Sequence, residues 1–261
     1  MSKSLEALYD RHNRRDAVAP DPLNFLYRYD NRCDIEIAGL VASTLAYGRV
    51  NQIGKSIAAI MEPMGPSPRR FLLSSSRRDL EELYRGFRHR FTGAAQIVAL
   101  LGAIGRCCET FGSMESTFIR GFYQEDDTVL PALTAFVKRM TDGAGCPLPF
   151  LIPSPEGGSA CKRLHLYLRW MIRSDNVDPG VWRSISPSKL LVPLDTHLHR
   201  ISLLLGLTKR RQADLKTALE VTSAFRLLSP RDPIRFDFAL ARLGMTGDES
   251  AIASLTECLR I

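Results

Sequence analysis

Apolar side chains recur at helical spacing along most of the chain, and few stretches alternate as a half-buried strand does. Ile37, Leu40 and Val41 fall on one stripe, for example, which predicts a buried helix over 35–47. Asp34 is its expected N-cap, because a short carboxylate accepts the free amides of a first turn. Similar patterns predict helices over 50–61, 77–84, 94–111, 128–140, 159–173, 195–205, 214–228 and 233–243. The chain is therefore expected to be all-α.

Two stretches interrupt this helical pattern. Residues 141–158 hold four glycines and four prolines, a density that forbids regular structure and predicts a long loop. Phe150, Leu151 and Ile152 inside this loop indicate that it packs on something, although a disordered spacer fits the composition equally well. A second loop is expected over 178–193.

The predicted helix over 159–173, which Ser159 would cap, carries two different faces. Leu164, Leu168 and Met171 contribute to its apolar stripe. Basic side chains recur at helical spacing on another face, without an acid among them, at Lys162, His165, Arg169 and Arg173. A solvated helix face explains this pattern as well as a functional one does.

The charge balance favours anionic partners. There are 35 Lys and Arg residues against 28 Asp and Glu, giving a net charge of +7 and a pI near 9.3, which points to nucleic acid first. Basic residues crowd 69–90, where three acids accompany them, and 183–211, where Asp195 is the only acid. Solvated faces are the competing explanation for both clusters. Counterion release from phosphates would use such clusters.

The sequence also indicates where in the cell the protein is located. No apolar run approaches the roughly 20 residues of a membrane helix, and the polar start of the chain lacks a signal-peptide core. We expect a cytoplasmic, nucleoid-associated monomer. The six cysteines form no C-x-x-C pair and no metal-site spacing. Only Cys258 lies near the C-terminus, so no iron–sulfur cluster is expected there, and no metal or cofactor is expected at all.

The clearest local motif is Pro193-Leu194-Asp195-Thr196-His197-Leu198-His199-Arg200. Asp195 is a well-formed N-cap, and Gly206 can take the left-handed position that ends the helix. An aspartate at a helix N-terminus stays anionic at the positive end of the helix dipole. It then serves either as a plain structural cap or as the group that stabilises a cationic sugar while a base departs.

This motif, with Val192 before it and Leu205-Gly206-Leu207 after it, resembles a segment of the helix-hairpin-helix DNA glycosylases, where the aspartate is the essential acid. Residues 37–44 resemble the early buried helix of that superfamily, and 47–53 resemble the turn that it inserts into DNA. Residues 236–244 resemble its late helix, without the iron–sulfur loop that follows there. Over nearly its full length, the chain most resembles the bacterial family called domain of unknown function 2400.

One part of the glycosylase pattern is missing. The Leu-Pro-Gly-Val-Gly hairpin, with the lysine at its end, does not occur: position 177 is Val177, and no lysine lies between Arg163 and Ser188. The lysine before that gap is Lys162, 33 residues ahead of Asp195 (195 − 162). A wide separation of this kind is a feature of the archaeal 8-oxoguanine glycosylases, and this resemblance makes Lys162 the candidate amine nucleophile.

The resemblance implies a two-lobed, helix-hairpin-helix glycosylase-like fold, with one lobe over 33–184 and the other made of 1–32 and 190–261. It implies a base-excision DNA repair enzyme, a DNA glycosylase with abasic-site lyase activity. Its substrate would be double-stranded DNA with an abasic site or a damaged base such as 8-oxoguanine. Lys162 and Asp195 would be catalytic, and Tyr47 or Arg49 would fill the gap left by a flipped base. The expected DNA contacts are Tyr47, Gly48, Arg49, Asn51, Arg163, Ser188, Lys189, His197, His199 and Arg200.

Two other functions compete with this one. The first is a catalytically inactive DNA-binding module of the same fold, which would bind DNA without releasing a base. The second is a metal-dependent phosphohydrolase that uses Asp195, His197 and His199. On one helix, however, an i,i+2 pair such as His197 and His199 points about 200° apart, which spoils joint ligation of a metal.

Overall fold

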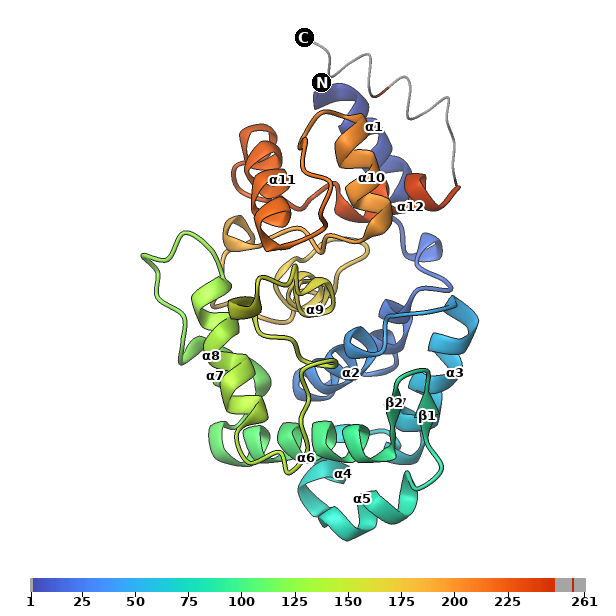
Figure 1. The fold of residues 1–261 in the computed structure, drawn as a ribbon. Helices are drawn as coiled ribbons and strands as arrows, with labels where there is room; N and C mark the ends of the chain where they lie inside the picture. Colours follow the sequence, from blue (N-terminus) through green and yellow to red (C-terminus); the bar gives the residue numbers. More distant parts are fainter. Residues whose placement is uncertain (1, 247–254, 256–261) are drawn as a thin grey trace. The chain divides into compact units, whose positions relative to one another are not determined.

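The computed structural model describes residues 2–246 and residue 255 (Figure 1). Helices dominate the described residues, and the one sheet among them is a two-stranded hairpin, so the all-α prediction is confirmed. The chain divides into two compact units. One comprises 18–157, and the other comprises the described parts of 1–17 and 158–261.

These boundaries differ from those expected from the sequence, which placed 18–32 with the C-terminal part and 158–184 with the central part. Residues 18–32 belong to the central unit because the short helix η2 (Pro22–Arg28) buries Leu23 and Leu26 and packs on α2 (Arg32–Thr44). Residues 158–184 belong to the other unit, where Arg169 forms a buried ion pair with Asp237.

Within the central unit, α2 and α6 (Ala94–Phe111) form much of the core. Every α2 side chain from Asp34 to Thr44 is buried, and α6 packs against α4, α5, α7 and α8. Among the described residues, α6 alone is long and apolar enough to cross a membrane, but 56% of it is buried inside the structure, as in a core helix. The other elements are α3 (Val50–Met61), η3 (Glu62–Met64), α4 (Pro68–Ser74), α5 (Arg77–Leu83), β1 (Arg88–His89), β2 (Thr92–Gly93), α7 (Met114–Ile119), α8 (Leu130–Thr141) and η4 (Pro155–Gly157).

Asp34 does not cap its own helix, so that prediction was wrong. Asn31 is the N-cap of α2, and its side chain accepts a hydrogen bond from the Cys33 amide at 2.9 Å. Asp34 lies in the first turn, is buried, and accepts a hydrogen bond from the Arg69 amide at 2.7 Å. Its carboxylate therefore satisfies a free amide at the start of α4 instead.

The glycine- and proline-rich stretch forms a packed loop over 142–157, apart from the short helix η4. Leu148, Leu151 and Ile152 are buried, each at most 2% exposed, whereas Phe150 between them is 45% exposed. Of the two interpretations left open by the composition, the packed loop is the one observed.

The unit formed by 1–17 and 158–261 is built around α9 (Lys162–Ile172), whose Trp170 is fully buried. Inside this unit α10 (Thr196–Leu204) packs closely on α12 (Asp237–Thr246) at Gly244. A Cβ atom at position 244 would lie only 3.0 Å from Ile201 Cδ1 and 3.1 Å from His197 Cβ. The other elements are α1 (Ser2–His12), η1 (Arg15–Ala17), η5 (Pro187–Lys189) and α11 (Leu215–Leu228).

Ser159 is not the N-cap of α9, contrary to prediction. The helix begins one residue after Cys161, which takes a left-handed conformation with φ of +43°. Ser159 instead accepts a hydrogen bond from the Cys161 amide at 3.2 Å. The serine hydroxyl thus stabilises the sharp turn ahead of the helix, and Lys162 becomes the first helical residue.

Candidate functional site

Lys162 and Asp195 lie together at the starts of α9 and α10. The Nζ atom of Lys162 is 3.4 Å from the Oδ2 atom of Asp195. The side chains are 36% and 15% exposed, respectively, so the pair is reachable from solvent without being freely solvated. Two residues 33 positions apart in the sequence therefore form one ionic pair at the surface of a single unit.

Asp195 is held in place by the helix that it begins. Its extended backbone leads into α10, and its Oδ1 atom accepts a hydrogen bond from the Leu198 amide at 2.8 Å. This confirms the predicted N-cap, and Gly206, with φ of +69°, takes the predicted left-handed position after the helix. Capping occupies one carboxylate oxygen and leaves the other facing Lys162.

Lys162 occupies the first position of its helix, where the helix dipole disfavours a cation. No acidic residue lies in this first turn, and Asp195 supplies the neighbouring negative charge. The lysine amine therefore lies beside one carboxylate, and an electrophilic group that reaches Asp195 Oδ2 also reaches the amine.

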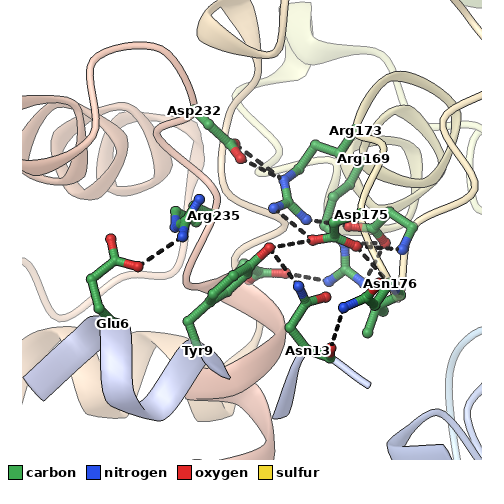
Figure 2. A network of polar contacts seen from close by, with 12 residues as sticks. Glu6, Tyr9, Asn13, Arg169, Arg173, Asp175, Asn176, Asp232 and Arg235 are labelled. Atoms are coloured by element: carbon green, nitrogen blue, oxygen red, sulfur yellow. Dashed lines mark hydrogen bonds and ion pairs between the residues drawn. The ribbon is translucent and has the colours of Figure 1, made fainter. Parts of the chain in front are cut away.

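Two turns further along α9, Arg169 is buried rather than solvated (Figure 2). Its Nε and Nη2 atoms both lie 3.1 Å from Asp178 Oδ1, and its Nη1 atom lies 2.6 Å from Asp237 Oδ2. All three side chains are at most 4% exposed. The solvated-face interpretation of this stripe is therefore wrong at Arg169, because acids from distant parts of the chain cover it.

Arg173 extends this buried network and is also covered by acids. Its guanidinium contacts Asp178, lies 3.0 Å from Asp232 and lies 2.9 Å from Asp175. Asp175 in turn accepts a hydrogen bond at 3.0 Å from the hydroxyl of Tyr9 on α1 (Figure 2). These partners were not predicted from the sequence, although a basic stripe without acids of its own indicated that acids from elsewhere would meet it.

Burial of these carboxyl groups shifts their protonation. Burial raises the pKa of Asp237 to about 6, against the opposing effect of Arg169, and the charge of Asp195 adds to the rise. Burial also raises the pKa of Asp178, against both arginines. Because Asp195 contributes to the shift at Asp237, the buried network and the candidate pair are electrostatically connected.

His165 lies one turn after Lys162 on α9 and is completely buried. Neither ring nitrogen has a hydrogen-bond partner among the described residues. Burial lowers the pKa of His165 to about 4, so the ring is neutral near pH 7. Protonation of this ring would place an uncompensated cation in the interior of the unit.

We therefore expect His165 to make the protein acid-sensitive. A histidine whose folded pKa lies below its unfolded value of about 6.5 contributes stability that is lost as pH falls from 6.5 to 4. Relative to His165→Leu, the wild type should lose up to about 1.4 kcal/mol of unfolding free energy per pH unit in this window. Denaturant titrations of both proteins at several pH values measure this difference.

The wild type must be compared with His165→Leu because the titration of Asp237 changes the free energy of unfolding in the opposite direction. Its raised pKa gives stability that is present below about pH 4 and lost as pH rises through 6. The pH profile of the wild type alone therefore sums two opposing effects. Parallel profiles of wild type and His165→Leu would contradict the proposed titration of His165.

The other predicted DNA contacts of this unit differ in exposure. His197 and Arg200 on α10 are exposed, and Arg163, Ser188 and Lys189 are half-buried. His199 is buried, and its Nε2 atom lies 2.8 Å from the Arg210 carbonyl oxygen. Its ring therefore joins two segments of the unit and is not presented to a ligand.

The remaining predicted contacts lie in the central unit, at the turn from α2 to α3. Arg49 and Asn51 are exposed, and Gly48 has φ of +103°. Tyr47 is half-buried, and its hydroxyl donates a hydrogen bond to the His89 carbonyl at 2.9 Å. The hydroxyl of Tyr47 is thus turned into the unit, which leaves Arg49 as the outward-facing member of the predicted pair.

No group of three or more potential ligands arranged to hold a metal occurs among the described residues. The geometry at Asp195, His197 and His199 agrees with this, since His199 is buried against a carbonyl while His197 is exposed. Five cysteines within 2–246 are free thiols, and Cys258 lies outside the described residues.

Comparison with known proteins identifies one family. The model of a family described as "Protein of unknown function (DUF2400)" matches residues 21–246, which is most of the chain. No curated protein and no solved structure gives a match.

Proposed function

The chain belongs to the DUF2400 family, and within it we propose that this protein is a DNA glycosylase with abasic-site lyase activity. The observation that carries the proposal is the 3.4 Å approach of Lys162 Nζ to Asp195 Oδ2. An amine beside a fixed carboxylate, both partly open to solvent, is the minimal pair for displacing a base from a sugar. The substrate is double-stranded DNA carrying a damaged base such as 8-oxoguanine, or an abasic site.

The reaction begins when the damaged nucleotide leaves the helical stack. The neutral amine of Lys162 attacks C1′, and the bond between C1′ and the base nitrogen breaks with its electrons leaving on the base, which takes up a proton. Ring opening and loss of a proton from nitrogen then yield an iminium between lysine and sugar. Removal of a C2′ proton breaks the C3′–oxygen bond, which cuts the strand.

Asp195 stabilises the positive charge that develops on the sugar as the base departs. Its N-cap hydrogen bond to the Leu198 amide fixes the carboxylate in advance, so little reorganisation is needed during the reaction. The same carboxylate pairs with the ammonium form of Lys162 in the resting protein. Entry of substrate would separate this pair, and the partly exposed ammonium would release its proton to solvent, which leaves the neutral amine facing C1′.

Binding to DNA would use the basic character of the chain and its exposed cations. Arg200 and His197 are exposed on the helix that Asp195 begins, and Arg49 is exposed at the start of α3. A net charge of +7 favours salt-sensitive, largely sequence-independent affinity for duplex DNA. We further propose that the protein has a two-lobed, helix-hairpin-helix glycosylase-like fold, is a monomer, and is located in the cytoplasm at the nucleoid.

Borohydride trapping tests this proposal directly, because only an enzyme that forms an iminium becomes covalently fixed to its DNA. We expect the wild-type protein to form a borohydride-dependent covalent complex with duplex DNA containing 8-oxoguanine or an abasic site, and not with undamaged duplex. If a broad panel of lesions gives neither base release nor trapping while DNA binding persists, the catalytically inactive binding module is the better description.

A further inference from the structure

The most exposed aromatic side chain among the described residues stands at the tip of the β1–β2 hairpin. Phe91 is 73% exposed. The two strands pair Arg88 with Gly93 and His89 with Thr92, so Arg90 and Phe91 form the turn between them. Exposing a ring of this size to water is unfavourable, which makes its position at a projecting tip informative.

Phe91 ends a row of aromatic rings that runs outward from the interior of the central unit. Tyr47 contacts Phe150 edge-to-face with ring centres 5.0 Å apart, and Phe150 contacts Phe91 in the same way at 5.9 Å. Phe150, from the 141–158 loop, is itself 45% exposed. The outer two rings therefore form an aromatic surface, and the inner ring supports it.

The hairpin is anchored more firmly than two short strands would be alone. The Tyr47 hydroxyl lies 2.7 Å from Thr92 Oγ1 and donates to the His89 carbonyl. His89 in turn lies 2.8 Å from the Ser56 hydroxyl through Nδ1 and 3.0 Å from the Tyr47 carbonyl through Nε2. These contacts fix the base of the hairpin against α3, so Phe91 is presented on a preorganised support.

The turn itself carries an unusual backbone. Arg90 has φ of +51°, a left-handed conformation that is uncommon for arginine and typical of glycine at the first position of a two-residue hairpin turn. Its side chain lies over Gly48, where a Cβ atom would come within 2.9 Å of Arg90 Cδ. The cation beside the outermost ring, Phe91, therefore has a backbone conformation that glycine would adopt more easily.

The hairpin and the helices α3 and α6, which both contact it, carry positive charge. No acidic residue occurs within 47–61 or within 84–108, the segments that form α3, the hairpin and most of α6. Several cations in these segments are exposed, namely Arg49, Lys55, Arg85, Arg88 and Arg90. Exposed aromatic rings in segments that carry exposed cations and no acids match a nucleic-acid strand, whose bases stack on aromatic faces while its phosphates meet the cations.

We propose that Phe91 and Phe150 form a stacking surface for an unpaired base of a DNA strand, with the surrounding arginines contacting the adjacent phosphates. This surface lies in the central unit and its binding does not depend on the chemistry at Lys162. It goes beyond the proposed reaction because it assigns a separate contact for unpaired bases in the DNA.

Replacement of Phe91 by alanine tests the proposal, because the side chain is exposed and the fold does not depend on it. We expect Phe91→Ala to weaken binding to a duplex with a short single-stranded gap about tenfold, as loss of one base–aromatic stack does, and to change binding to intact duplex little. Phe91→Trp should retain the affinity for gapped DNA. Fluorescence anisotropy at one fixed salt concentration measures all of these affinities.

Tyr123 supplies a matched control. It is 64% exposed, but the acidic residues Glu125, Asp126 and Asp127 follow it, so it should not attract a DNA strand. Tyr123→Ala should therefore bind gapped DNA as the wild type does. Unchanged affinity of Phe91→Ala for gapped DNA would overturn the proposal and favour a protein partner for this surface, and an equal loss on intact duplex would overturn the preference for unpaired bases.

The outcome is separable from that of the proposed enzymatic function. The binding measurements need no base release, so they can be repeated in the Lys162→Gln protein. A tenfold effect of Phe91→Ala in that background would support the stacking surface even if no lesion gives covalent trapping. Trapping by wild type together with no effect of Phe91→Ala would uphold the enzyme and reject the surface.

Discussion

Lys162→Gln should abolish covalent trapping on 8-oxoguanine DNA by borohydride. Glutamine offers no amine that can form an iminium, so the covalent step is lost altogether. Affinity for duplex DNA should stay nearly the same, because one charge is a small part of the total phosphate interaction. The measurement is a denaturing gel of the borohydride-treated complex beside a binding titration.

Lys189→Gln is the matched control for this experiment. It removes the same charge from a half-buried position on η5, in the same unit, and should leave trapping intact. If trapping survives Lys162→Gln and is lost in Lys189→Gln, the nucleophile is Lys189 and our assignment is incorrect.

Asp195 allows the catalytic and structural roles to be separated at one position. Asp195→Asn should slow base release roughly 100-fold, the order of loss when one preorganised electrostatic group is removed, while keeping the fold. Asparagine caps a helix about as well as aspartate does. Asp195→Ala should cause the same kinetic loss and in addition cost about 1 kcal/mol of unfolding free energy. Base release by Asp195→Asn at the wild-type rate would reduce Asp195 to a cap.

The second large effect concerns stability. Arg169→Met should lower the free energy of unfolding by about 3–5 kcal/mol at neutral pH, because it leaves Asp178 and Asp237 buried without their shared partner. Arg173 still contacts Asp178, so Asp237 is the carboxylate most affected. Chemical denaturation of both proteins gives the difference.

The pH dependence of that loss provides an internal check. Arg169 opposes the burial that raises the pKa of Asp237 to about 6, so its removal raises this pKa further. A carboxyl group with a raised folded pKa gives stability that is lost as pH rises, and the variant should therefore be least impaired in acid.

Arg77→Ala is the corresponding exposed control. Arg77 pairs with Glu81 at 2.8 Å on α5, but both side chains are more than half exposed, and such pairs contribute about 0–1 kcal/mol. A similar small loss in Arg169→Met would mean that Asp178 and Asp237 are not held as buried carboxylates.

Much of the secondary structure followed from local patterns in the sequence. The predicted helix over 94–111 has the observed bounds of α6, and the prediction over 50–61 has those of α3. Asp195 was identified as an N-cap because its carboxylate precedes an apolar stripe and a glycine stop. Periodicity and capping are local properties, which one segment of sequence contains in full.

What the sequence did not reveal depends on contacts between distant segments. The approach of Lys162 to Asp195 was expected from a resemblance and not from spacing. The four aspartates around Arg169 and Arg173 could not be assigned, since no local pattern says which acid meets which base. Burial of His199 and the inward hydroxyl of Tyr47 were missed for the same reason.

The two carboxylate oxygens of Asp195 have different partners, and together they limit which amino acids can occupy this position. The cap at Leu198 accepts aspartate, asparagine, serine or threonine, and rejects the longer glutamate that chemistry alone would tolerate. A carboxylate facing Lys162 restricts the choice to acids. Aspartate alone satisfies both requirements. A descendant that abandoned the proposed chemistry would be free to drift to asparagine, serine or threonine while its helix persisted, so one of these residues at position 195 would indicate a scaffold without the proposed activity.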